Sequence, residues 1–143
     1  MPDRQLLLKA ATTSGYVGQL VDHNLRAVGL PAFLLPTLTH IRDREPVSPS
    51  EISAVAGVPM TTLRDNVQRL VDRKLVRRTP NPADGRSYLL RLTARGRAVA
   101  EAAGVALLDT YVALERNLPR PLATYERALD ELNRSLELVL DEA

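Results

Sequence analysis

Residues 48–74 read SPSEISAVAGVPMTTLRDNVQRLVDRK, and this stretch contains the clearest local signals in the chain. Ser48 is suited to cap a helix, Pro49 suits the first helical position, and Glu51 follows Ser48 at the spacing of a capping box. These signals predict a short helix that ends near Ala56.

A tight turn at Gly57 follows, and a longer helix is predicted from about Met60 to Lys74. With about 100° between successive residues, apolar side chains gather on the side that we expect to face the core: Leu63, Val67, Leu70 and Val71. The opposite side carries polar side chains, with Arg64 at its edge: Thr61, Thr62, Asp65, Gln68, Arg69 and Asp72. A short helix, a glycine turn and a longer helix form the helix-turn-helix pattern, whose second helix enters the major groove of DNA.

Two short strands are predicted after this helix, at 75–80 and 87–93. The segment between them, 81–86, is dense in turn residues, so the three pieces are expected to form a β-hairpin. A further helix is predicted before this part, from about Ala32 or Pro36 to Arg44, and long helices are predicted at about 3–28, from a Thr93 cap to about Leu118, and at 122–140. The predicted fold is mainly α with a small β-hairpin. We expect a single domain over 1–143, with a winged helix-turn-helix at about 32–97 between long dimerisation helices at about 3–28 and 98–141.

The outer helices carry long apolar faces, which the small winged helix-turn-helix part of one chain cannot fully cover. A second copy of the chain is the simplest partner for them, so we expect a homodimer. The alternative is a monomer whose terminal helices form an antiparallel bundle. The residues expected at the dimer interface are Leu7, Val21, Leu25, Leu122, Leu129, Leu132, Leu136 and Val139.

The composition is that of an ordinary globular protein, with 45% hydrophobic and 3% aromatic residues, so the core is expected to be aliphatic. The chain has no cysteine, which excludes disulfides and thiol redox sensing within it. Without a long apolar run or a signal-peptide pattern, we expect a cytoplasmic protein with no membrane partner.

Charge is unevenly distributed along the chain. Residues 64–97 contain ten basic and three acidic residues, a balance of +7, whereas 98–143 contain four basic and nine acidic residues, a balance of −5. One part therefore suits contact with phosphates and the other does not. The alternative is a basic surface that is merely solvated.

The polar face of the second helix supplies the candidates for reading double-stranded DNA. Arg64, Gln68 and Arg69 are candidates for base edges, since arginine suits guanine and glutamine suits adenine. Thr61 and Thr62 are placed for phosphates or a thymine methyl group. Asp65 either accepts from a cytosine amino group or orients the arginine four residues later.

The hairpin supplies a second set of candidates. Arg86, at its tip, suits insertion into a narrow minor groove, and Asp84 is expected to fix the loop and hold that arginine in one rotamer. Ser87 stands beside them. Arg73, Arg77 and Arg78 are expected to neutralise backbone phosphates.

From Ser48 to Gly96 the chain resembles the multiple antibiotic resistance regulator (MarR) family. The resemblance depends on EISAVAGV at 51–58, LVDRKLVRR at 70–78, PADGRS at 82–87 and LTARG at 92–96, and the flanking helices fit as well. It implies a homodimer on a pseudopalindromic operator, with wing Arg86 in the minor groove. It also implies a regulator that is usually a repressor and is often released by a small aromatic or phenolic effector.

The chain departs from the family pattern at three positions. Lys74 stands where the family prefers glycine, Asp65 where a basic residue is common, and Asn66 where an apolar residue is usual. These departures do not change the expected fold. They do mean that the operator sequence of known family members is not carried over to this chain.

The resemblance also implies an effector pocket between the dimer helices and the DNA-binding part, and it makes four polar or aromatic residues the candidates for that site: Tyr16, His23, His40 and Tyr111. For each the alternative is a core, interface or surface role. Two histidines and no clustered carboxylates predict no metal site and no cofactor. No motif indicates catalytic residues, so an enzyme is not expected. The remaining alternative is a winged-helix module that docks to other proteins without specific DNA binding.

Overall fold

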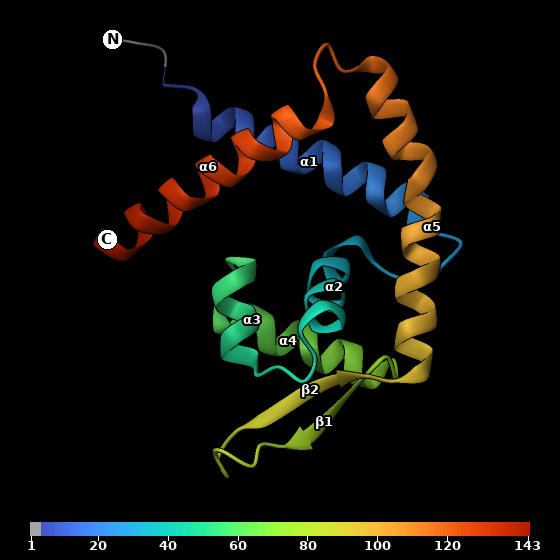
Figure 1. Ribbon diagram of the computed structural model, residues 1–143, viewed down its shortest axis with the longest axis vertical. Helices are drawn as coiled ribbons and strands as arrows, with labels where there is room; N and C mark the ends of the chain where they lie inside the picture. The colour runs from blue at the N-terminus through green and yellow to red at the C-terminus, as the bar shows by residue number, and fades with distance from the viewer. Residues whose placement is uncertain (1–3) are drawn as a thin grey trace. The chain divides into compact units, whose positions relative to one another are not determined.

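The computed structural model describes residues 4–143, in two compact units that run up to Leu107 and from Leu108 to Ala143. Its elements follow the predicted order (Figure 1): α1 (Leu6–Leu25), the 3-10 turn η1 (Ala32–Leu34), α2 (Leu35–Arg44), α3 (Pro49–Ala56), α4 (Met60–Asp72), β1 (Val76–Pro80), β2 (Tyr88–Leu92), α5 (Ala94–Asn117) and α6 (Leu122–Glu142). The mainly helical winged fold is therefore confirmed. Among residues 4–143, no helix combines the length and the apolar character needed to cross a membrane.

The core of the first unit is aliphatic, as the composition predicts. It draws leucine, isoleucine and valine side chains from every element between α1 and β2, and the largest fully buried ones are Leu25, Leu34, Leu38, Ile41, Ile52, Leu63, Leu70, Leu90 and Leu92. Burying a leucine or isoleucine side chain stabilises a fold by about 1.5–3 kcal/mol, so this cluster is the main source of stability for the unit.

The capping box at the start of α3 is present. The Oγ of Ser48 accepts a hydrogen bond from the Glu51 amide at 3.3 Å, and the Glu51 carboxylate accepts one from the Ser48 amide at 3.1 Å. Gly57 then ends the helix in the left-handed conformation, with φ at 62°. These local interactions set the position of the turn between α3 and α4.

Helix α4 ends at Asp72, two residues before the predicted end. The Lys74 amide donates to the Val71 carbonyl at 2.9 Å, and the Leu75 amide donates to the Leu70 carbonyl at 3.0 Å. This pair of bonds is the Schellman motif, which requires a left-handed residue, and Lys74 adopts it with φ at 60°. A lysine therefore occupies a backbone conformation that suits glycine.

The hairpin is antiparallel, with Val76 opposite Leu92 and Pro80 opposite Tyr88. Each strand is slightly shorter than predicted: β1 begins at Val76 rather than Leu75, and β2 runs from Tyr88 to Leu92 rather than from 87 to 93. A further bridge joins Val47 to Leu90, so the loop before α3 adds a third extended segment beside β2. The hairpin projects from the helices of the first unit, with its turn at the far end (Figure 1).

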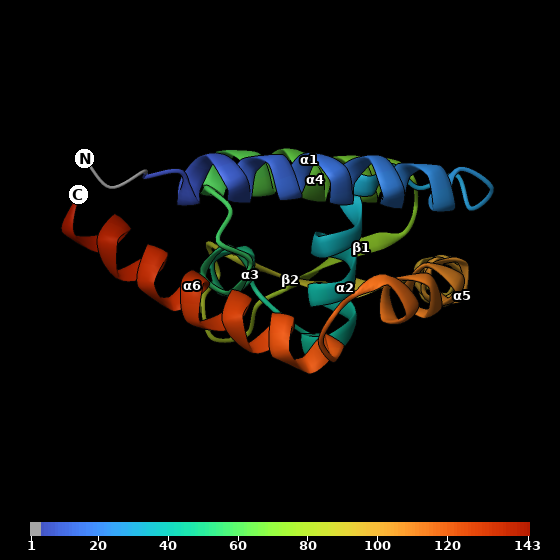
Figure 2. The ribbon, with the colours of Figure 1, turned by 90° about the horizontal axis from the view of Figure 1, so that it is seen from above.

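Helix α1 is an unbroken rod in both views (Figures 1 and 2) but ends at Leu25, short of the predicted Val28. The chain turns there, through Gly29 at φ 75°. The expectation that Leu25 lies at a dimer interface is wrong, because its side chain is fully buried in the core of its own unit. At its C-terminal end, the apolar face of α1 packs against η1 of the same unit.

Helix α5 begins at the predicted cap and runs from the first unit into the second. The Oγ1 of Thr93 accepts from the Gly96 amide at 2.9 Å and donates to the Lys74 carbonyl at 2.7 Å. One side chain therefore caps α5 and binds the chain segment that ends α4.

Candidate nucleic-acid interface

Helix α4 presents the polar face that its sequence predicts. Leu63, Val67 and Leu70 are fully buried. The opposite side is exposed along its whole length: Thr61, Thr62, Arg64, Asp65, Gln68, Arg69 and Asp72. Asn66, which was not assigned to either face, is buried at 7% exposure on the core side.

Arg69 is held by two groups of the protein itself. Its Nε donates to the Asp65 carboxylate at 2.9 Å, and its guanidinium lies 5.7 Å from the centre of the Phe33 ring. The structure therefore has the Asp65–Arg69 pair, which was one of the two roles left open for Asp65. Phe33 was not among the predicted site residues. The chain has only five aromatic residues, and each is a potential partner for an arginine.

Gln68 is also engaged inside the protein. Its Nε2 donates to the Asp72 carboxylate at 2.8 Å, and its Oε1 accepts from Nη2 of Arg78 at 2.9 Å. The Arg78 guanidinium lies 5.2 Å from the centre of the Tyr88 ring, on the neighbouring strand. A row of contacts therefore links α4 to both strands of the hairpin.

The remaining arginines of the interface divide into bound and free side chains. Arg73 donates to the Gly29 carbonyl at 3.1 Å, so it stabilises the turn after α1 in addition to any phosphate contact. Among residues 4–143, the guanidinium groups of Arg64, Arg77 and Arg86 make no hydrogen bond or ion pair. These three exposed cations are available for phosphates or bases.

The hairpin tip is fixed by its own acceptors. The Asp84 carboxylate accepts from the Arg86 amide at 3.0 Å, and the Asn81 side chain accepts from the Ala83 amide at 3.0 Å. The expected role of Asp84 in fixing the loop is present, but it acts on the backbone of Arg86 and leaves its guanidinium unbound. Ser87 is half-buried and donates to the Tyr88 carbonyl at 3.4 Å.

Glu45 joins three elements, and the sequence interpretation did not identify it. Its carboxylate accepts from the Leu92 amide at 2.6 Å and pairs with the guanidinium of Arg97 on α5. The Glu45 side chain is only 19% exposed, so this pair is better shielded than a surface ion pair. The bound carboxylate connects the end of α2 to the wing and to the first turns of α5.

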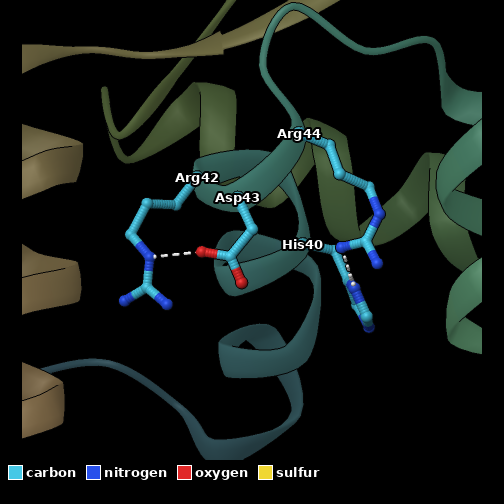
Figure 3. A network of polar contacts seen from close by, with 4 residues as sticks. All are labelled: His40, Arg42, Asp43 and Arg44. Atoms are coloured by element: carbon cyan, nitrogen blue, oxygen red, sulfur yellow. Dashed lines mark hydrogen bonds and ion pairs between the residues drawn. The ribbon is translucent and has the colours of Figure 1, made fainter.

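Of the four candidates for an effector site, three are exposed: Tyr16, His23 and Tyr111. His40 is half-buried and lies in a polar network with Arg42, Asp43 and Arg44 (Figure 3). Nη1 of Arg44 contacts Nδ1 of His40 at 2.9 Å, and burial, followed by the charge of Arg44, lowers the pKa of His40 below its ordinary value of 6.5. An effector role for these four residues stays a prediction.

The expected dimer residues other than Leu25 are accessible in the single chain. Leu7, Leu129 and Val139 are more than half exposed, and the others are half-buried: Val21, Leu122, Leu132 and Leu136. Exposed apolar side chains also continue along α1 and α5, at Leu6, Leu8, Tyr16, Val17, Val105 and Leu108. Within residues 4–143, no group of histidine and acidic side chains has the arrangement of a metal site.

A helix-turn-helix followed by a two-stranded wing, both rich in exposed arginine, defines a winged helix-turn-helix protein. Residues 35–87 match the sequence model of the MarR family. The chain is 38% identical over 66 residues to the transcriptional repressor NicR of Pseudomonas putida, an alignment that covers 46% of this chain and 42% of NicR. It is 32% identical over 83 residues to the multiple antibiotic resistance protein MarR of Escherichia coli, covering 58% of each chain. The matched part thus spans about half the length of these curated relatives.

Solved structures extend the likeness to nearly the whole chain. The M. tuberculosis regulator MosR, in complex with DNA, superposes with a TM-score of 0.83 at 26% identity, covering 94% of this chain and 97% of MosR. A mutant of E. coli MarR, complexed with operator DNA, superposes with a TM-score of 0.82 at 27% identity, covering 90% of this chain and 94% of that protein. The comparisons thus give a sequence match to the MarR family over residues 35–87, and a likeness to two DNA-bound transcriptional regulators over nearly the whole chain.

Proposed function

We propose that this protein is a sequence-specific DNA-binding transcriptional regulator that binds a pseudopalindromic operator as a homodimer. Helix α4 enters the major groove, and Arg86 at the wing tip enters the adjacent minor groove. Repression is the expected mode of action, and release by a small aromatic or phenolic effector is the expected control.

The observation that carries the proposal is the set of free arginine side chains on α4 and the hairpin. Arg64 on α4, Arg77 on β1 and Arg86 at the tip are exposed and unpaired among residues 4–143, while nearby arginines are held by protein groups. Unpaired guanidinium groups on a reading helix and a wing suit phosphates and base edges. The two DNA-bound regulators of the same fold support this assignment, and the protein-docking alternative is not favoured.

The dimer is supported by the apolar surface that the single chain leaves exposed. Leu7, Tyr16 and Val17 on α1 are each more than half exposed, and so are Leu138 and Val139 on α6. A monomer rarely leaves so many large apolar side chains in water, and a symmetric partner would bury them. The winged helix-turn-helix of each copy would then contact one of the two half-sites of an operator.

The test is fluorescence anisotropy of the purified protein against DNA from upstream of its own gene, with scrambled DNA as control, over a salt series. We expect selective binding that weakens steeply as salt rises, because several arginines displace counterions from the DNA. Weak binding that does not distinguish this upstream DNA from the scrambled control would argue against sequence-specific regulation at that site. A weak salt dependence at all sites would favour a docking module.

A further inference from the structure

Two of the three base-reading candidates on α4 are already bound to other protein groups. Gln68 contacts Asp72 and Arg78, and Arg69 contacts Asp65 and Phe33. Only Arg64 presents a free side chain among residues 4–143. The N-terminal half of α4 therefore has a free base-reading candidate, whereas both candidates in its C-terminal half are engaged by protein groups.

The amide of Gln68 has a defined orientation because of its partners. The Asp72 carboxylate only accepts, so it must face the NH₂ group, and the Arg78 guanidinium only donates, so it must face the carbonyl oxygen. Reading adenine requires the same carbonyl oxygen and the same NH₂ group together. Base contact by Gln68 would therefore cost both contacts with the protein.

Arg78 is fixed from two sides by this arrangement. Gln68 binds Nη2 at 2.9 Å, and the Tyr88 ring lies 5.2 Å from the guanidinium carbon. The Arg78 side chain is exposed, so its other N–H groups remain available. A guanidinium held in this way loses little side-chain entropy when it meets a phosphate.

We infer that Gln68 is a positioning residue that holds Arg78 for a phosphate contact, and that base reading on α4 belongs to its N-terminal half, with Arg64 as the principal reader. This inference rests on the proposed function. It assigns Asp72 a role as well, since that carboxylate fixes the amide. Sequence preference then depends on Arg64, whereas overall affinity depends on the Asp72–Gln68–Arg78 row.

The first test is selection of preferred sites from a random DNA library. The proteins are the wild type, Arg64→Ala, Gln68→Ala and the charge-neutral double change Gln68→Glu with Asp72→Asn. The double change reverses the direction of the hydrogen bond between positions 68 and 72. The amide introduced at position 72 donates to the carboxylate introduced at position 68, and that carboxylate still accepts from Arg78. It also removes the NH₂ group that adenine reading needs, so it separates positioning from reading.

We expect Gln68→Ala to select the same sequence as the wild type while binding every site more weakly. The double change should keep the wild-type sequence and bind within about threefold of wild-type affinity, since independent contacts are untouched. Arg64→Ala should lose preference at one position in each half-site. Loss of preference at a shared position in both Gln68→Ala and the double change would overturn the inference.

A double-mutant cycle on DNA affinity is the second test. If Gln68 acts through Arg78, Gln68→Ala should add no further loss to Arg78→Ala. Fold losses that multiply would mean that Gln68 contacts DNA independently, which would overturn the inference. Equal thermal unfolding of the variants by circular dichroism excludes a folding defect. A wild-type protein that selects no sequence would instead overturn the proposed function, so the two failures are distinguishable.

Discussion

The carbonyl oxygen of Leu75 lies 1.9 Å from the position that a Cβ atom on Gly96 would occupy. The contact is backbone against the start of a helix, so no side-chain rotation relieves it. Gly96 is needed because the first turn of α5 packs directly on the chain between α4 and β1. The wing and α5 meet at this glycine.

Gly96→Ala is therefore expected to destabilise the protein by about 1–3 kcal/mol, the range of overpacked cores and displaced backbone. Chemical denaturation measures the change. Gly104→Ala is the matched control, because it is also on α5 but has open space around its Cβ position. That control should stabilise the protein by up to about 1 kcal/mol, since alanine favours a helix interior. Equal effects of the two changes would contradict the role given to the Leu75 contact.

Lys74→Gly is expected to stabilise the protein by about 0.5–1 kcal/mol. Lys74 has φ at 60°, where a side chain is strained, and glycine adopts this conformation freely, although its unfolded chain has more entropy to lose. Thermal unfolding measures the change. Lys74→Ala keeps the strain while removing the charge and should change stability much less. A stabilising alanine variant would show that charge, not backbone strain, is the relevant property.

Glu45→Ala should destabilise the protein more than Arg97→Ala. Loss of Glu45 leaves the Leu92 amide without its acceptor, which costs about 1–3 kcal/mol. Loss of Arg97, a half-exposed partner, should cost about 1 kcal/mol or less. Urea unfolding of both variants compares them. The reverse order would mean that the ion pair, not the backbone contact, is the stabilising interaction.

The stability of the protein should depend on pH through His40. Burial lowers the pKa of this imidazole in the folded state below 6.5, so between the two values the unfolded chain binds more protons. The stability contributed by neutral His40 is thus complete above pH 6.5 and is lost as pH falls through the lowered pKa. His40→Gln should flatten this part of the profile of unfolding free energy against pH. His23→Gln, outside the network in Figure 3, is the control, and a profile unchanged by His40→Gln would refute the prediction.

Arg86→Ala should weaken DNA binding about fivefold or more and reduce the dependence of log affinity on log salt by about one. The guanidinium is free among residues 4–143, and Asp84 fixes only its backbone, so folding should be unaffected. Fluorescence anisotropy over a salt series measures both effects. Arg116→Ala, an exposed position in the last turn of α5, is the control. Equal losses for the two variants would point to a non-specific effect of charge.

Much of the local structure could be predicted, because its signals lie within a few residues of each other. The capping box at Ser48, the turn at Gly57 and the cap at Thr93 appear where expected. The errors lie at the ends of helices. The predicted end of α4 at Lys74 missed the Schellman motif, since the left-handed residue there is a lysine rather than a glycine.

The candidate site was predicted as a surface but not as a set of contacts. The polar face of α4 follows from helical period, so its exposed residues are as expected. The sequence left open whether Asp65 pairs with Arg69, and it contained no sign of the partners of Gln68. Leu25 was misassigned because an apolar seam looks the same whether it faces the core or a partner chain.

The amino-acid sequence alone predicts the order of the helices and strands, the caps at Ser48 and Thr93, and the apolar face of α4. These follow from propensity, periodicity and short-range hydrogen bonds. Which arginines are free depends on the tertiary structure, because it brings Phe33 beneath Arg69, and Gln68 and Tyr88 around Arg78. It also places the Glu45 carboxylate between Leu92 and Arg97. Such contacts join residues far apart in the chain, and residue spacing carries no information about pairings that arise only when the elements pack together.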